Sequence, residues 1–157
     1  MPRSITEATI LRDAPTVTSS RPVSDALQLL IDSRLPAIPV VDESGAFRGI
    51  FGEREFIGAL FPGYLSQLGS ARFLTHSLDD TIDRRSGCVA EPVGTYANTE
   101  HVDVDVDAAD AQLAEVFLHH RVLIVPVTEN RRVVGVVTRT AFFRELATRV
   151  VARADDA

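Results

Sequence analysis

The sequence of 157 residues contains no lysine, no tryptophan and only one cysteine, Cys88. A lone cysteine cannot form an internal disulfide, which fits a reducing compartment, so we expect a cytoplasmic protein. Without lysine the chain lacks both a P-loop lysine and an amine for a Schiff base. No apolar run approaches the roughly 18 residues that span a bilayer, and the first residues lack the apolar stretch of a secretory signal. We therefore expect no membrane partner.

The charged residues are acidic in excess, with 16 arginines against 22 acidic residues and a net charge of −6. A chain with a negative net charge repels a polyanion on average, so we expect no nucleic-acid partner. A local arginine patch can still bind a phosphate. No nucleophile elbow, Walker loop, zinc-ligand spacing or GxGxxG segment is present, and we do not expect an enzyme.

The most informative feature is an internal duplication. Pro39 matches Pro126 at an offset of 87 positions, and after one deletion Gly49 matches Gly135 at an offset of 86. A repeat of this length is one supersecondary unit that cannot bury its apolar face alone. We therefore expect the two copies to pack face to face, with clefts between them as the natural place for a ligand.

Each copy has the pattern of a strand, a helix, two strands and a second helix. In the first copy we expect strands over 16–18, 37–41 and 47–51, and helices from Ser24-Asp25 to about Arg34 and over 52–60. In the second copy we expect strands over 102–106, 123–127 and 133–137, and helices over 110–120 and from a Thr138 cap through Val150. The last helix carries an apolar stripe at helical spacing: Phe142, Phe143, Leu146 and Val150.

The segment between the copies, 61–100, is longer than a simple linker and contains aromatic residues, which predicts folded structure. Within it, Ser77 to Asp80 is similar to a capping box that starts a helix through Ile82. We divide the chain into 1–60, the first repeat with its lead-in; 61–92, a helical insertion; and 93–157, the second repeat with a C-terminal helix.

The glycines and prolines inside the predicted strands also carry information. Glycine is costly in a strand unless a backbone or a ligand approaches closely, which we expect at Gly49 and Gly135. Pro39 and Pro126 lack a backbone N–H, which predicts edge strands or strand starts.

A metal site is not expected. His119 and His120 are adjacent on a helix and point about 100° apart, so they do not converge on one ion. The acidic run at Asp103, Asp105 and Asp107 lacks the glycine and the distal glutamate of a calcium loop, and its alternation favours a solvated strand face.

Both copies resemble the CBS domain, and the whole chain is similar to a tandem CBS pair. The resemblance covers residues 8–60 and 93–150 and rests on Val23–Leu27, Ile38–Asp42, Phe47–Phe51, Val125–Val127 and Val133–Arg139. It implies an α/β (α+β) fold of two βαββα repeats packed with pseudo-two-fold symmetry, here with a helical insertion between the repeats.

The resemblance also implies a ligand, because CBS pairs commonly bind adenosine-type nucleotides between their repeats. AMP, ATP or S-adenosylmethionine is the expected ligand, and no cofactor is required. The family places the base against the backbone before the proline, the phosphate at a Thr or Ser that starts the second helix, and the ribose at an Asp three residues later. The corresponding candidate residues are Val17, Ala37, Ile38, Pro39, Glu55, Val102, Ile124, Val125, Pro126, Thr138 and Arg139.

The nucleotide motif is incomplete in both copies. Thr138 occupies the phosphate position of the second copy, beside Arg139, but Ala141 replaces the ribose-binding acid. In the first copy Gly52 replaces the Thr, and Glu55 stands at the Asp position, where it is equally explained as a helix-capping residue.

Two functions therefore remain open. The chain is either a regulatory module that senses an adenine nucleotide, or a degenerate pair that binds none and serves as a dimerisation or docking platform for an unidentified protein. In both cases we expect a homodimer through the helices of both repeats. Aromatic and apolar residues of the insertion would form the natural docking surface: Phe61, Tyr64, Leu65 and Phe73.

Overall fold

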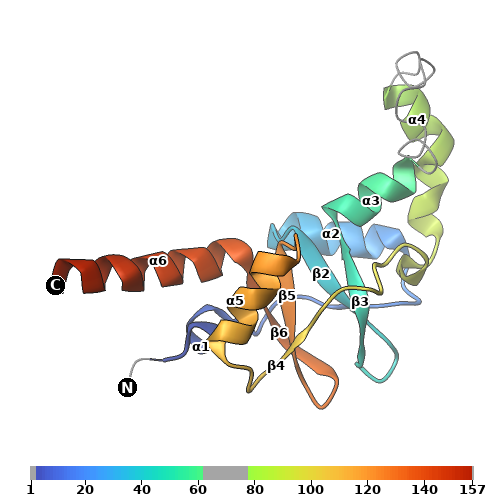
Figure 1. Cartoon of the computed structure of the whole chain (residues 1–157). Helices are drawn as coiled ribbons and strands as arrows, with labels where there is room; N and C mark the ends of the chain where they lie inside the picture. Colours follow the sequence, from blue (N-terminus) through green and yellow to red (C-terminus); the bar gives the residue numbers. More distant parts are fainter. Residues whose placement is uncertain (1–2, 62–77, 157) are drawn as a thin grey trace.

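The computed structural model describes residues 3–61 and 78–156. The first lobe contains, in order, β1 (Val17–Thr18), α2 (Val23–Ser33), β2 (Ala37–Val41), β3 (Phe47–Gly52) and α3 (Glu53–Leu60). The second lobe contains β4 (Val104–Asp105), α5 (Asp110–His119), β5 (Ile124–Glu129), β6 (Arg132–Thr138) and α6 (Arg139–Asp156). A short α1 (Ile5–Thr9) precedes the first lobe, and α4 (Leu78–Arg85), η3 (Ser86–Ala90) and η4 (Val93–Thr95) lie between the lobes in sequence (Figure 1). The predicted βαββα order is confirmed in both copies.

Each lobe holds one three-stranded sheet, in the order β1-β2-β3 and β4-β5-β6. The outer pairings match: β1 runs parallel to β2 with Val17 beside Val40, and β4 runs parallel to β5 with Val104 beside Val127. The other pair in each sheet is antiparallel, with a register shift at the same place in both copies. The duplication seen in the sequence is therefore a duplication of topology and register.

The prediction for the two prolines was wrong. Pro39 and Pro126 each stand third in the central strand of their sheet, not on an edge strand or at a strand start. A central position is tolerated because β1 pairs only with Val40 and Val41, so Pro39 lies just before the paired stretch on that side.

Several predicted boundaries also shift. The helix expected from Ser24-Asp25 begins at Val23, whose N–H donates to the carbonyl of Glu91 at 2.9 Å, so no side-chain cap is needed. It ends at Arg34 as predicted, with that residue left-handed at φ 59°. The strand expected over 102–106 is only Val104–Asp105.

The insertion is partly described. A helix is present where one was predicted, from Leu78 to Arg85, and the Arg85 guanidinium donates to the carbonyl of Ala59 at the end of α3. Phe61 follows α3 directly. Ser77, Tyr64, Leu65 and Phe73 lie outside the described residues.

The lead-in segments cross between the lobes, which the sequence did not indicate. Leu11 pairs with Val136 of the second lobe through two backbone hydrogen bonds of 2.8 and 3.2 Å. Its repeat counterpart Asn98 pairs with Ile50 of the first lobe, at 2.8 and 3.0 Å. As a result Ile5 is buried in the core of the second lobe, and Val93 is buried in the core of the first.

These crossings explain the strand glycines. A Cβ atom on Gly135 would lie 2.7 Å from the carbonyl oxygen of Leu11, and a Cβ on Gly49 would collide with the carbonyl of Asn98. The expected close approach is confirmed, and in both cases a backbone makes it. No other residue fits beside the crossing segment without moving it.

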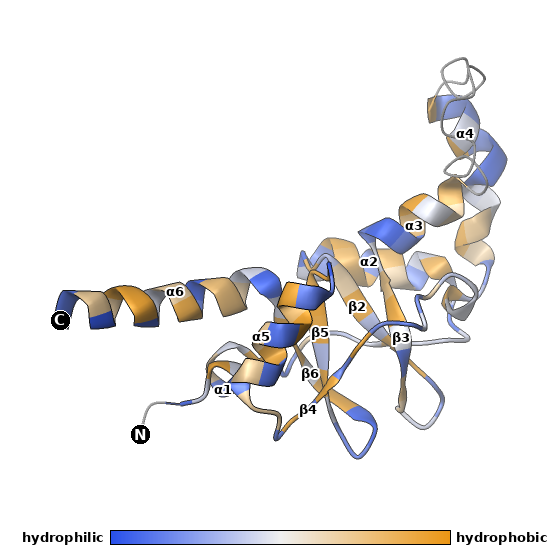
Figure 2. Ribbon diagram, in the orientation of Figure 1, coloured by the Kyte–Doolittle hydropathy of each residue, from blue (hydrophilic) through white to orange (hydrophobic). Residues whose placement is uncertain are grey.

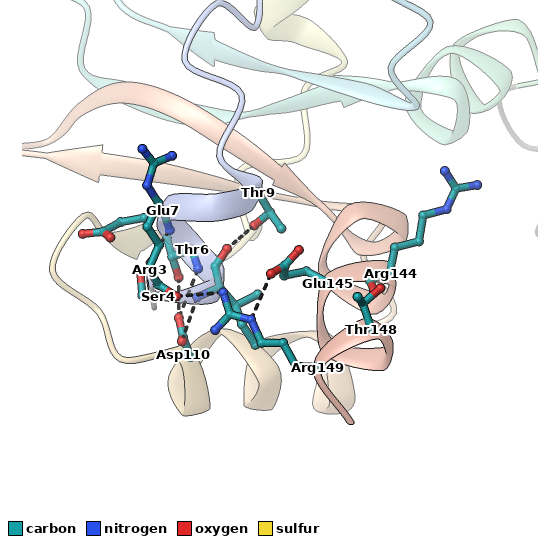
Figure 3. Close-up of polar contacts among 11 residues, drawn as sticks. Arg3, Ser4, Thr6, Glu7, Thr9, Asp110, Arg144, Glu145, Thr148 and Arg149 are labelled. Carbon is teal, nitrogen blue, oxygen red and sulfur yellow. Dashed lines mark hydrogen bonds and ion pairs between the residues drawn. The ribbon is translucent and has the colours of Figure 1, made fainter. Parts of the chain in front are cut away.

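A polar cluster fixes the N-terminal helix to the second lobe (Figure 3). The carboxylate of Asp110 accepts hydrogen bonds from the backbone N–H groups of Ile5 (2.8 Å) and Thr6 (3.1 Å) and from the Thr6 hydroxyl (3.2 Å). Burial acts to raise the pKa of Asp110, but these hydrogen bonds outweigh it, and the pKa lies below its ordinary value. Arg149 of α6 adds a hydrogen bond of 2.7 Å to the carbonyl of Arg3. The α1 segment is thus held by α5 and α6, although more than 100 positions separate it from them.

A third apolar cluster joins the lobes and is called the seam here. Its buried members are Ala37 and Ile50 from the first lobe and their repeat counterparts Ile124 and Val136 from the second. Each lobe therefore contributes the same two positions, which confirms the pseudo-two-fold packing.

Gly135→Ala should destabilise the protein by about 2 kcal/mol, because the added methyl group overpacks the Leu11 crossing. The matched control is Gly58→Ala in α3, where a Cβ meets nothing within 4 Å and helix propensity predicts a gain of up to about 1 kcal/mol. Urea unfolding of the two variants measures the difference. Equal stability of both variants would contradict the role given to the crossing.

Candidate functional site

A hollow of about 140 Å³ opens at the seam between the two lobes. One wall comes from the start of β2, the end of β3 and the start of α3, and the other from the loop that enters β5. We call it the seam hollow; its lining residues are Pro36, Ala37, Ile50, Glu53, Arg54, Glu55, Asn98, Arg121, Val122, Leu123 and Ile124.

Backbone hydrogen bonds fix both walls. The first N–H of α3, on Glu53, donates to the carbonyl of Pro36 at 3.0 Å, so the helix start is tied to the start of β2. The equivalent bond in the second lobe runs from Arg139 to Leu123 at 2.9 Å. The side chains of the first turn of α3 are therefore held at the mouth of the hollow.

Glu55 is the half-buried carboxylate of this site. Burial raises its pKa, while hydrogen bonds from the backbone N–H groups of Glu55 and Gly52 and the charge of Arg54 act to lower it; the net shift is upward. The Gly52 N–H lowers the pKa of Glu55, as expected for a residue at a capping position, and the Glu55 side chain also lines the hollow. Capping and ligand binding are compatible at this position.

Gly52 has no space for a side chain. A Cβ atom there would collide with the carbonyl of Pro36 and would lie 2.5 Å from the Cβ of Ala37. The hydroxyl that the family pattern places at this position is therefore excluded sterically, and any phosphate here must be held by other groups. Arg54 and Arg121 are the cations that line the same hollow.

Three of the eleven candidate ligand residues line the seam hollow: Ala37, Glu55 and Ile124. Four others are strand residues with buried side chains, namely Ile38, Pro39, Val125 and Pro126. Val17 is buried and lines a separate surface hollow beside Thr16 and Arg21. Val102 packs against the core of the second lobe.

Thr138 and Arg139 lie at the start of α6, in the equivalent position of the other lobe. The Thr138 hydroxyl accepts a hydrogen bond from the N–H of Ala141 at 3.1 Å, so the predicted cap is confirmed. The N–H of Arg139 is bonded to Leu123, as described above. Two of the first N–H groups of α6 are thus already satisfied, which weakens this helix start as a phosphate site.

Residues 6–62 and 93–148 both match the CBS domain family. The chain belongs to the CBS domain family. MJ1404, an uncharacterized protein of Methanocaldococcus jannaschii, is 26% identical over 137 residues, which make up 87% of this chain and 30% of that protein.

Solved structures of CBS pairs share the fold. CBSX2 from Arabidopsis thaliana superimposes with a TM-score of 0.71 at 18% identity, covering 98% of this chain and 99% of that one. The structure of CBSX2 in complex with AMP superimposes with a TM-score of 0.67 at 19% identity, and the match covers 94% of this chain and 98% of that one. A CBS domain-containing protein of unknown function from Kribbella flavida gives 0.66 at 22% identity, covering 92% and 98%.

Sequence reasoning did not identify Arg54, Asn98 and Arg121 of this CBS pair as residues of the hollow. Asn98 lines the hollow only because the lead-in segment crosses to the other lobe. Arg121 lines it because the loop before β5 faces the first turn of α3. One signal was available: Arg121 is the repeat counterpart of Arg34. Within the described ranges, 3–61 and 78–156, no group of His, Cys, Asp or Glu is arranged to hold a metal, and no helix is long and apolar enough to cross a membrane.

His101 is a buried titratable residue of the second crossing segment. It is 7% exposed, and neither ring nitrogen has a hydrogen-bond partner in the structure. Burial lowers its pKa; the charge of Asp103 acts in the opposite direction, and His120 acts in the same direction as burial. The neutral ring is therefore the form that the folded protein favours.

The stability of the CBS pair should therefore fall on acidification because of His101. Its pKa is lower in the folded than in the unfolded chain, where it is about 6.5, so its contribution is fully present above pH 6.5 and is lost as the pH falls through the folded-state pKa. His101→Leu should change stability at pH 7.5 by less than about 1 kcal/mol and should flatten the profile below pH 6.5. Unfolding curves between pH 7.5 and 5 test this against His119→Leu, which replaces an exposed histidine. Parallel profiles for the wild type and His101→Leu would refute the assignment.

Proposed function

We propose that this CBS pair is a regulatory module that binds an adenine-containing ligand, such as AMP, ATP or S-adenosylmethionine, in the seam hollow. The observation that carries the proposal is the combination of groups in one place: a half-buried carboxylate, two arginines and apolar walls from both lobes. A CBS pair of the same fold, CBSX2, has been crystallised with AMP.

Each part of such a ligand has a counterpart in the hollow. The apolar side chains of Ala37 and Ile124 suit a flat base. The carboxylate of Glu55 can accept both ribose hydroxyls. The guanidinium groups of Arg54 and Arg121 suit a phosphate, replacing the hydroxyl that Gly52 cannot supply.

The size of the hollow connects binding to regulation. At about 140 Å³ it is smaller than the roughly 300 Å³ at which small-molecule sites begin. A whole nucleotide therefore needs a wider hollow, and we propose that the lobes move apart at the seam to provide it. A ligand that binds the wider arrangement more tightly shifts the protein toward it, which is the differential affinity that regulation needs.

Titration with adenosine, AMP, ATP and S-adenosylmethionine, followed by thermal shift and calorimetry, tests the proposal. A ligand present at 100 times its Kd should stabilise the protein by about 2.7 kcal/mol. Glu55→Gln should weaken adenosine and AMP alike by about tenfold, since glutamine still caps the helix. Arg121→Gln should weaken AMP and spare adenosine.

Variants at the start of α6, the repeat counterpart of the start of α3, act as controls. Thr138→Ala and Arg139→Gln should leave binding unchanged. If these two variants abolish binding and Glu55→Gln does not, the ligand binds at the start of α6 and the proposed site is wrong. If no ligand produces a shift, the nucleotide proposal fails altogether.

A second candidate function is a dimerisation platform, and α6 is the feature that favours it. The stripe predicted along this helix is divided: Phe142 is buried against Phe117, with ring centroids 5.3 Å apart, whereas Phe143, Leu146 and Val150 are 64, 41 and 58% exposed. The helix extends well beyond the rest of the second lobe, with apolar residues along its length (Figures 1 and 2). An exposed apolar stripe of this kind marks an interaction surface.

We infer that the occupant of this stripe is a second copy of the chain, with the two α6 helices antiparallel. The first turn of the helix begins with Arg139 and has no acidic residue, whereas the last turn carries Asp155 and Asp156 beside Arg153. Antiparallel pairing therefore places the two terminal aspartates of each copy beside the basic start of the other, with the apolar stripes between them.

Light scattering at micromolar concentration should give twice the chain mass of 17.1 kDa. Phe143→Asp should produce a folded monomer, because a carboxylate in the apolar stripe has no partner. Thr148→Asp, on another side of the helix, should remain dimeric. A monomeric wild type, or dissociation caused by Leu118→Asp on α5 but not by Phe143→Asp, would disprove pairing through α6.

A further inference from the structure

A second and larger hollow lies where the two hairpin turns meet, at residues that do not line the seam hollow. Its volume is about 590 Å³, and its lining includes Arg48 from the first lobe and Arg131 and Arg132 from the second. We call it the hairpin hollow. Small-molecule sites have volumes of roughly 300 to 1,000 Å³, so its size is appropriate for a ligand.

Backbone contacts join the two turns that form the hairpin hollow. The N–H of Phe47 donates to the carbonyl of Arg131 at 2.9 Å, and Ala46 forms an antiparallel bridge with Arg132. Ala46 and Arg132 are equivalent positions of the two repeats, so the bridge lies at the pseudo-two-fold axis. Both walls are therefore rigidly placed relative to each other.

The cation from the first lobe is oriented in advance. Arg48 donates to the Asp42 carboxylate at 2.9 Å. That carboxylate is itself fixed by the N–H groups of Ser44 and Ala46, at 2.9 and 3.0 Å, and by the Ser44 hydroxyl at 2.6 Å. The Asp103 carboxylate, which also lines the hollow, accepts the Thr128 hydroxyl at 2.7 Å. The charge of Asp42 is thus compensated by Arg48, whereas Asp103 has only the neutral Thr128 hydroxyl as its hydrogen-bond partner among the residues described.

The two cations from the second lobe are free. Arg131 and Arg132 are exposed, and neither guanidinium has an ion pair among the residues that the structure describes. Three arginines against two carboxylates leave an excess of positive charge in a chain whose net charge is −6. A concentration of cations against the overall charge favours a small anion and disfavours a long polyanion.

Backbone strain indicates that Arg131 is retained for its side chain. Asn130 and Arg131 have φ angles of 52° and 70°, in the left-handed region that favours glycine. The first repeat has Gly45 at the position equivalent to Arg131, with φ 86°. The turn of the second copy is one residue shorter and has two successive positive φ angles instead of one, and it carries an arginine at the second position, where two-residue turns favour glycine. Such outliers concentrate at functional sites.

We propose that the hairpin hollow is an anion site that binds the phosphate group of a small phosphorylated molecule through Arg48, Arg131 and Arg132. The planar guanidinium group matches phosphate oxygens in pairs, which suits it to this role. Because the cations come from both lobes, an occupied site also holds the lobes together.

Calorimetry with pyrophosphate, at constant ionic strength, is the direct test, because this probe has no base or ribose to bind the seam hollow. We expect one pyrophosphate per chain. Arg131→Gly should weaken it by tenfold or more while leaving the melting temperature of the free protein unchanged or higher, because glycine relieves the strain. Arg132→Gln should weaken it similarly and provides a second variant with no backbone change.

Two controls isolate the charge at this site. Asn130→Gly relieves strain in the same turn without removing a cation, and Arg84→Gln removes an exposed arginine of α4. Both variants should bind pyrophosphate like the wild type. Absence of binding at millimolar pyrophosphate, or undiminished binding by Arg131→Gly and Arg132→Gln, overturns the proposal. If Arg121→Gln abolishes pyrophosphate binding instead, the anion binds in the seam hollow, and this result also overturns the proposal.

Discussion

The backbone bridges between Leu11 and Val136 and between Asn98 and Ile50 are the contacts on which the rest of the structure depends. Each brings the segment that precedes one repeat onto the last strand of the other. The cores follow from this exchange, because Ile5 and Val93 are buried in lobes that their own sequence positions do not suggest. Neither lobe is complete without a segment that leads into its neighbour. The pair is therefore one cooperative unit, although its sequence reads as two similar halves.

The same bridges constrain the seam hollow. Asn98 lines the hollow and at the same time pairs with Ile50, so the crossing segment forms part of its wall. A ligand that widens the seam acts directly on this pairing and, through the chain, on the core around Val93. In the function proposed above, binding energy would in this way be converted into a change between the lobes, with no separate transmission element.

The sequence predicted those features that depend on local pattern or on the repeat itself. The order of elements, the end of α2 near Arg34, the cap at Thr138 and the close approach at Gly49 and Gly135 all belong to this group. The crossings were not predicted because backbone hydrogen bonds at Leu11 and Asn98 leave no side-chain signature. Pro39 was misplaced for a related reason, since whether a central strand tolerates proline depends on the length of its neighbour β1. The same distinction applies to the candidate site. The family pattern pointed to Ala37, Glu55 and Ile124, whereas Arg54 and Arg121 were recognised only once the packing of the lobes was known.

The duplication also shows how two different hollows arise from one repeated unit. Equivalent positions at the starts of α3 and α6 keep the same backbone contact, since Glu53 and Arg139 donate to equivalent carbonyls. Their side chains have diverged, with Gly52 opposite Thr138 and Glu55 opposite Ala141. The hairpin turns depart from this equivalence, because the one-residue deletion between the copies falls there. The second turn has two successive positive φ angles, at Asn130 and Arg131, where the first has one, at Gly45. Turns of two residues favour glycine at the second position, so an arginine there is a local cost of the turn. The guanidinium group that this residue places at the hairpin hollow is a reason for the arginine that the fold itself does not supply.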